Sequence, residues 1–288
     1  MSRTGAGVGR RPGDRRHFAV SLLVVAAIAL FCLGPLFWIG ITSLKAPGTE
    51  FRTPVEYFPD EPTLESYAKV TSESFSVQTA IRNSLIVSTG AMVGTIVIAS
   101  LAAYAIARVR FRFRFASILL IQAAGLVPPI IIIAPTFIML RAAGLVGSLW
   151  AMIIPNIAYG VPLATLLLSS YLSRLPVNLE EAASIDGASW FRIYWQIILP
   201  VSAPAIVSAG VLSFLGSWGE FMHAFTVGLG LPALRTVPVA ILGYSQAFEL
   251  QWSWVAAATV IAIFPIVTLA VLFQRGVVRG LTSGAVSG

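Results

Sequence analysis

Two long apolar segments are joined by the sequence SRLPVNLEEAASIDGASWFRIYWQIILP, residues 173–200. A plain connection between membrane spans needs only to be short and polar, but this one contains the signals of two short helices. Glu180 and Glu181 suit the positive N-terminal end of a first helix. Gly187 supplies the left-handed residue that ends it, and Ser189 can cap a second helix. The sequence therefore predicts two short helices between the apolar segments.

The second short helix is predicted to be amphipathic. Phe191, Tyr194, Trp195 and Ile198 recur at i, i+3, i+4 and i+7, and this spacing places them on one apolar face. Pro200 then marks the bend into the next apolar segment. An apolar face beside charged residues favours a protein partner, and the alternative is an amphipathic segment that lies on lipid headgroups.

The rest of the chain indicates that its solvent is lipid. Of its 288 residues, 57% are hydrophobic and only 11% are charged, whereas a soluble domain carries about 25% charged residues. The apolar residues form segments long enough to cross a bilayer as helices, which need about 20 residues each. The first segment is predicted to be an uncleaved span and not a signal peptide. The six predicted spans are residues 18–44, 84–107, 115–140, 149–172, about 203–227 and 252–273.

Basic residues predict the orientation of these spans. Thirteen of the 19 Lys and Arg residues lie in the N-terminal arm, the connections after spans two and four, and the C-terminal tail. Since positive residues favour the cytoplasmic side, both termini are predicted to be cytoplasmic. The chain then divides into a disordered arm (1–17), a six-span membrane domain (18–273) and a tail (274–288).

Several function classes find little support in the composition. The net charge of +7 comes from short basic clusters beside the spans, so orientation and not nucleic-acid binding explains it. Cys32 is the only cysteine, and His17 and His223 are the only histidines, so we expect no metal site and no Cys/His catalytic pair. No Gly-Lys pair exists, which excludes a standard phosphate-binding loop. We therefore expect no catalytic residues, and ATP hydrolysis on another polypeptide.

One stretch resembles the signature of a family of membrane proteins. Glu181-Ala182-Ala183, three residues, Gly187, nine residues and Ile197-x-Leu199-Pro200 match the EAA loop of ABC importer permeases at every defined position. Further stretches are similar to carbohydrate-uptake permeases of the maltose second-subunit type: Asn83-Ser84, Pro128-Pro129, Leu234-Arg235-Thr236-Val237-Pro238 and QRGVVRGLTSGAV (residues 274–286). Two positions depart from that family, which usually has Asn in place of Gly219 and Lys in place of Ser287.

The resemblance implies a fold, partners and a cargo. It implies an all-α type I ABC importer permease (MetI-like) fold with six transmembrane helices in a bacterial inner membrane. It implies a second homologous permease, two copies of an ATPase subunit that binds ATP and Mg²⁺, and an extracytoplasmic solute-binding protein. The implied cargo is a sugar or oligosaccharide. A glycerol-phosphate-type solute is the alternative, and an ATP-independent secondary carrier is a more distant one.

The resemblance also assigns a coupling loop, residues 174–200, that docks on the ATPase. Its predicted coupling residues are Glu180, Glu181, Ala182, Ala183, Asp186, Gly187, Phe191, Ile197, Leu199 and Pro200.

A solute path is predicted near Trp218, Glu220 and Phe221. Glu220 lies 20 residues after Pro200, or about 30 Å along a straight helix at 1.5 Å per residue, which places it near the outer interface. It is either an acid wetted at the outer mouth or a contact to the solute or a partner. Trp218 either belongs to an interfacial aromatic belt or stacks on a sugar.

Overall fold

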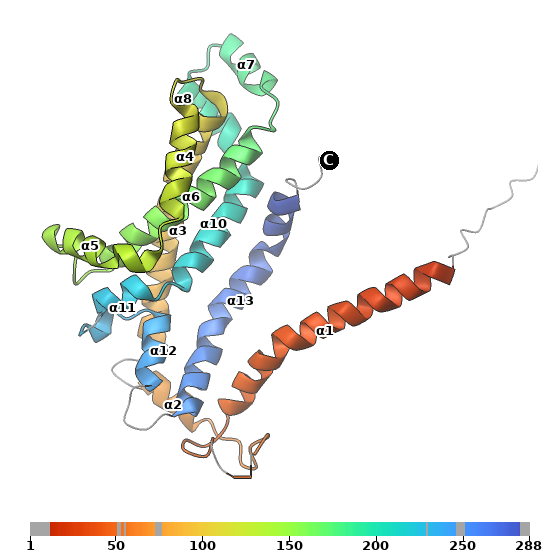
Figure 1. Ribbon diagram of the computed structural model, residues 1–288, viewed down its shortest axis with the longest axis vertical. Coiled ribbons are helices and arrows are strands. Elements are labelled where there is room, and N and C mark those ends of the chain that lie inside the picture. The colour runs from red at the N-terminus through yellow and green to blue at the C-terminus, as the bar shows by residue number, and fades with distance from the viewer. Residues whose placement is uncertain are drawn as a thin grey trace, which may run out of the picture.

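The computed structural model describes residues 12–50, 53–54, 56–72, 77–228, 230–245 and 251–282 (Figure 1). These residues form helices and connections without a β-strand, which confirms the all-α prediction. In chain order the helices are α1 (Pro12–Thr42), α2 (Glu65–Ser72), α3 (Val77–Arg108), α4 (Arg114–Gly125), α5 (Pro129–Ala142), α6 (Trp150–Leu172), α7 (Asn178–Ile185), α8 (Trp190–Ile193), α9 (Leu199–Val201), α10 (Ala203–Trp218), α11 (Met222–Gly228), α12 (Val237–Ser245) and α13 (Trp252–Thr282). A π-helical turn, Tyr194–Ile198, joins α8 to α9, and a 3-10 turn, Pro232–Leu234, precedes α12.

Four of these helices, α1, α3, α6 and α13, are each long and apolar enough to cross a membrane. Two bent pairs of shorter helices bring the number to six if each pair is one span, as the sequence predicts. The third predicted span is not one straight helix, because α4 and α5 meet at 95°. Pro128 holds an extended backbone and Pro129 opens α5, and proline disfavours a helical residue before it.

The fifth predicted span is also bent and is shorter than expected. The segment Trp190–Val201 meets α10 at 76°, and the break lies at Ser202, two residues after Pro200. Helix α10 ends at Trp218, so the predicted end near residue 227 is wrong, and α11 is a separate short helix. Figure 1 shows α11 beside α5, near the middle of the long axis of the molecule.

The predicted terminal segments differ from the structure in part. Residues 12–17 belong to α1, so the disordered arm predicted for residues 1–17 is too long at this end; residues 1–11 lie outside the described residues. Helix α13 extends through most of the predicted tail to Thr282, and residues 283–288 lie outside the described residues.

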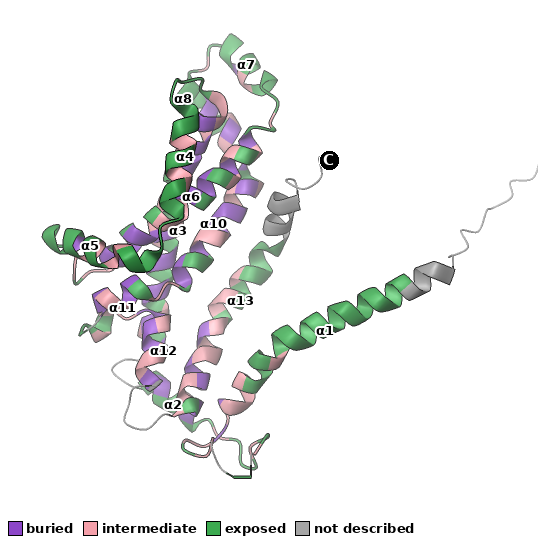
Figure 2. Cartoon of the chain, viewed as in Figure 1, coloured by how far each residue is buried: buried purple, intermediate pink, exposed green. Residues whose placement is uncertain are grey.

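Small residues let the central helices α3, α6 and α10 pack closely. A Cβ atom added at Gly94 of α3 would lie 2.4 Å from Cδ1 of Ile157 on α6. A Cβ atom added at Gly160 of α6 would lie 2.6 Å from Oγ1 of Thr95 on α3. Helix α1 behaves differently: it leans away from α13, and residues 17–33 are exposed (Figures 1 and 2). This apolar surface suits lipid, where its exposure carries no hydrophobic penalty.

Candidate functional site

Loop 174–200 is fixed to the end of α3 by an ion pair. Nε of Arg108 lies 2.6 Å from Oε1 of Glu180, and both side chains are almost buried. The hydroxyl of Tyr104 donates to the same carboxylate at 3.2 Å, and Nη2 of Arg108 donates to the carbonyl of Leu175 at 2.8 Å. Glu180 therefore faces its own chain, whereas Glu181 is exposed. The sequence does not predict this pair, because Arg108 and Glu180 lie far apart in the chain.

The two predicted helix boundaries of the loop are confirmed. Glu180 and Glu181 lie in the first turn of α7. Gly187 has a φ of +80°, and its N–H donates to the Ser184 carbonyl while the Ala188 N–H donates to the Ala183 carbonyl, both at 3.0 Å. This pattern is a Schellman motif, in which the left-handed residue satisfies the last carbonyls of a helix. The side chain of Ser189 accepts from the Arg192 N–H at the start of α8.

The prediction of one apolar face on the second helix is wrong. Tyr194 and Ile198 are 3% and 2% exposed, whereas Phe191 and Trp195 are 57% and 52% exposed. The physical reason is the π-turn at Tyr194–Ile198, whose i→i+5 hydrogen bonds break the 3.6-residue period. The four side chains consequently divide between the inside of the chain and its surface.

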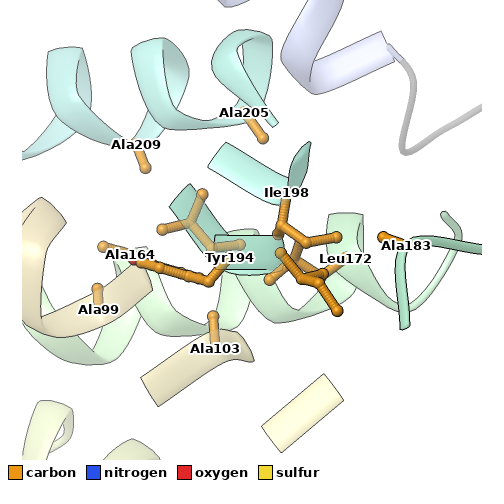
Figure 3. Close-up of a cluster of buried hydrophobic side chains, with 11 residues drawn as sticks. Ala99, Ala103, Ala164, Leu172, Ala183, Tyr194, Ile198, Ala205 and Ala209 are labelled. Atoms are coloured by element: carbon orange, nitrogen blue, oxygen red, sulfur yellow. The ribbon is translucent and has the colours of Figure 1, made fainter. Parts of the chain in front are cut away.

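The inward side chains of the loop form part of a core between α3, α6 and α10. Figure 3 shows Tyr194 and Ile198 among small residues of the three helices, with Leu172 and Ala183 at the edge. The hydroxyl groups of Tyr194 and Ser100 are 2.7 Å apart, so the loop also hydrogen-bonds to α3. Ile197 and Leu199 pack against this core. The loop therefore has a fixed position on the helices.

The outward side chains form an aromatic patch, defined here as Trp190, Phe191 and Trp195. The Phe191 ring lies 5.8 Å from the Trp190 ring and 6.0 Å from the Trp195 ring, measured between centroids. The patch lies on the end of the molecule that carries α7, and Figure 2 shows this end largely exposed. Five other residues of the predicted coupling set are also exposed: Glu181, Ala182, Asp186, Gly187 and Pro200.

A cavity of about 340 Å³ lies mainly between α6 and α10. We call it the α6–α10 cavity. Its polar lining side chains are Asn156, Tyr159, Ser213, Ser217 and Glu220. The Glu220 carboxylate accepts from the backbone N–H groups of His223 at 2.8 Å and Ala224 at 3.1 Å, so it is held at the start of α11.

The outer-interface estimate for Glu220 assumed a straight helix from Pro200, and this assumption is wrong. The chain bends at Ser202, and α10 has only 16 residues, or about 24 Å of helix. Figure 1 accordingly shows the start of α11 well short of α2.

The two aromatic residues of the predicted solute path do not line the α6–α10 cavity. Trp218 is 4% exposed and stacks on Phe214 at 5.7 Å, in a core with residues of α12 and α13. Phe221 stacks on Phe225 at 5.2 Å. A role for either residue in the solute path stays a prediction. Among the described residues, no three His, Cys, Asp or Glu side chains are grouped to hold a metal ion.

Comparison with known proteins identifies the family. Residues 80–283 match the family described as "Binding-protein-dependent transport system inner membrane component". The chain belongs to this family. It is therefore a multi-pass inner membrane protein and a transport component, not an enzyme, as the resemblance implied.

Two relatives of this inner membrane component cover nearly its whole length. The trehalose/maltose transport system permease protein MalG of Thermococcus litoralis is 38% identical over 93% of this chain and 96% of its own. The sulfoquinovosyl glycerol transport system permease protein SmoH of Agrobacterium fabrum is 36% identical over 95% of this chain and 93% of its own.

A solved structure confirms the importer fold of this inner membrane component. It is a chain of a bacterial ABC transporter that imports the acidic polysaccharide alginate. The two chains superimpose with a TM-score of 0.76 at 19% identity, over 93% of this chain and 99% of the other.

Proposed function

We propose that this chain is one permease subunit of an ATP-driven importer for a sugar or oligosaccharide. An extracytoplasmic binding protein delivers the solute, and a second homologous permease completes the path through the membrane. Support comes from the relatives, whose names include permeases for trehalose and maltose, galactooligosaccharides and diacetylchitobiose. A glycerol-phosphate-type cargo is the second candidate.

The observation that carries the proposal is the aromatic patch on loop 174–200. Trp190, Phe191 and Trp195 are all more than half exposed, although the loop beneath them is fixed to α3. Tryptophan and other aromatic residues are enriched at the centres of protein interfaces, where they fill pockets on the partner. The patch thus fits a cleft on a cytoplasmic ATPase subunit, two copies of which bind ATP and Mg²⁺.

Contacts behind the patch explain how force on the loop can reach the spans. The Arg108–Glu180 ion pair and the Ser100–Tyr194 hydrogen bond join the loop to α3. The same loop continues into α10 through the bend at Ser202. When the ATPase subunits close on ATP, they pull the loop, and α3 and α10 tilt with it. This tilt opens the path on the outer side, so that the solute enters it. The reverse tilt then releases the solute to the cytoplasm.

The test uses the complete transporter, co-expressed and reconstituted in proteoliposomes. We expect the double variant Phe191→Ala/Trp195→Ala to insert and fold, because both side chains are exposed, but to lose most ATPase co-purification and ATP-dependent uptake. Phe264→Ala is the matched control, because Phe264 is 73% exposed on α13, away from the loop. Normal uptake by the double variant would show that the patch does not dock the ATPase. Full uptake without ATP would instead favour a secondary carrier.

A further inference from the structure

We infer that Glu220 makes the α6–α10 cavity reject anions, and that the solute is therefore uncharged. This inference rests on the proposed import function and narrows its cargo. It also separates the two candidate cargoes, because a neutral sugar fits the inference and a glycerol-phosphate-type solute does not. The fold itself does not determine whether the solute is charged, because the alginate importer with the same fold takes up an acidic polysaccharide.

Three hydroxyl groups of the cavity lining lack a hydrogen-bond partner within the described residues. They are the hydroxyls of Tyr159, Ser213 and Ser217, and all three oxygen atoms are buried. Ser217 as a whole is 8% exposed. Buried polar groups in proteins nearly always have partners, because an unpaired one is costly. Because these oxygen atoms have almost no accessible surface, a solute in the cavity cannot reach them, and they do not select the solute.

Charge in the cavity has one sign. Within the part of the chain that the structure describes, Glu220 is the only charged side chain that lines it, and no Lys, Arg or His does so. The carboxylate accepts from two backbone N–H groups, which fix its position at the start of α11. His223 approaches it at 3.6 Å but packs against Tyr159 and does not line the cavity.

On this subunit an anionic solute would therefore meet a like charge and no cation. Phosphates and carboxylates are bound in proteins mainly by Arg, Lys and clustered N–H donors, and the lining supplies none of these side chains. The remaining lining is largely apolar, with leucine, alanine and glycine on α6 and α10. In such surroundings repulsion between like charges is screened less than in water. The cavity consequently favours a neutral solute and tolerates a cation better than an anion.

The electrostatic test places a cysteine in the cavity wall of the complete transporter. Gly216→Cys is introduced, because Gly216 lines the cavity, is exposed and has room for a side chain. In this background Cys32 is replaced by serine and the partner subunits lack cysteine. Labelling rates are measured with cationic and anionic methanethiosulfonate reagents, each divided by its rate with a free thiol. With Glu220 present we expect the cationic reagent to be favoured by about tenfold or more. In Glu220→Gln we expect this preference to fall to about one.

The control is Glu65→Gln, which removes an exposed carboxylate from α2 and should leave the preference unchanged. A preference near one in the presence of Glu220, or a preference that Glu220→Gln does not reduce, would overturn the inference.

Uptake separates this inference from the proposed function. ATP-dependent uptake of labelled trehalose or maltose, without uptake of glycerol 3-phosphate, supports both. ATP-dependent uptake of glycerol 3-phosphate contradicts the inference and leaves the import function standing. If a panel of neutral and anionic sugars shows no ATP-dependent uptake at all, the proposed function itself is wrong.

Discussion

Replacing Gly187 by valine should lower uptake and solute-stimulated ATP hydrolysis together without unfolding the protein. Gly187 ends α7 with a φ of +80°, a left-handed conformation that glycine adopts without steric cost. The residue sits in open space, because a Cβ atom built on it would meet no atom within 4 Å. The whole cost of Gly187→Val therefore comes from the backbone and not from a clash.

The size of this cost follows from the conformation. A residue with a Cβ atom loses roughly 1–2 kcal/mol in the left-handed region, and a β-branched residue lies at the upper end. About 2 kcal/mol corresponds to about a 30-fold shift of the equilibrium toward a rearranged loop, since 1.4 kcal/mol is a factor of ten. The rearrangement reorients α8, which carries Trp190 and Phe191, and misplaces the aromatic patch.

The assay is uptake measured beside solute-stimulated ATP hydrolysis in proteoliposomes. We expect both activities of Gly187→Val to fall together, by up to about 30-fold, while the solute affinity of the separate binding protein stays unchanged. Gly187→Asn should retain more activity, because asparagine tolerates the left-handed region.

A matched control separates coupling from general strain. Gly144 has a φ of +68°, also in open space, but it lies in the connection between α5 and α6 on the predicted outer side. Gly144→Val introduces the same backbone strain far from loop 174–200 and should leave coupling largely intact. If Gly187→Val keeps normal uptake and normal stimulated ATP hydrolysis, loop 174–200 is an ordinary connection, and the reasoning is refuted.

Other predictions concern the loop anchor, helix packing, topology and energy source. Glu180→Gln leaves Arg108 on α3 without a counter-charge in a nearly buried site, which should lower the free energy of unfolding by about 1–3 kcal/mol. We expect lower heat stability and weaker stimulated ATP hydrolysis. Unchanged values of both would contradict this prediction. Gly160→Ala places a Cβ atom 2.6 Å from Oγ1 of Thr95 on α3 and should lower stability by about 1–3 kcal/mol. The measurement is the temperature of heat aggregation in detergent, which should fall. In the control Gly216→Ala the added Cβ atom meets no neighbour, so this temperature should not change. With the native cysteine removed, a cysteine at Arg112 should label only from the cytoplasm and one at Glu61 only from outside; the reverse would refute the assigned orientation. The purified chain alone should hydrolyse no ATP, and robust hydrolysis would overturn the division of labour between subunits.

Local features of the chain were predictable because their signals are local. Segment length and hydropathy identify the spans, since a helix in lipid must satisfy its own backbone groups. The Schellman stop at Gly187 and the cap at Ser189 depend on residues within one helical turn, so sequence spacing predicts both. The same holds for the resemblance that predicts a coupling loop at residues 174–200, a role that stays a prediction.

Features that depend on distant residues appear only in the folded chain. Arg108 and Glu180 are 72 positions apart, and nothing near either residue announces the other. The π-turn at Tyr194–Ile198 is one such case, because burying Tyr194 against α3, α6 and α10 overrides the regular helical period. The sequence alone therefore determined that this chain crosses a membrane, and it predicts where the coupling loop lies. Packing between distant helices decided which aromatic residues are exposed and that Glu220 lines a cavity, because both depend on contacts that local spacing does not encode.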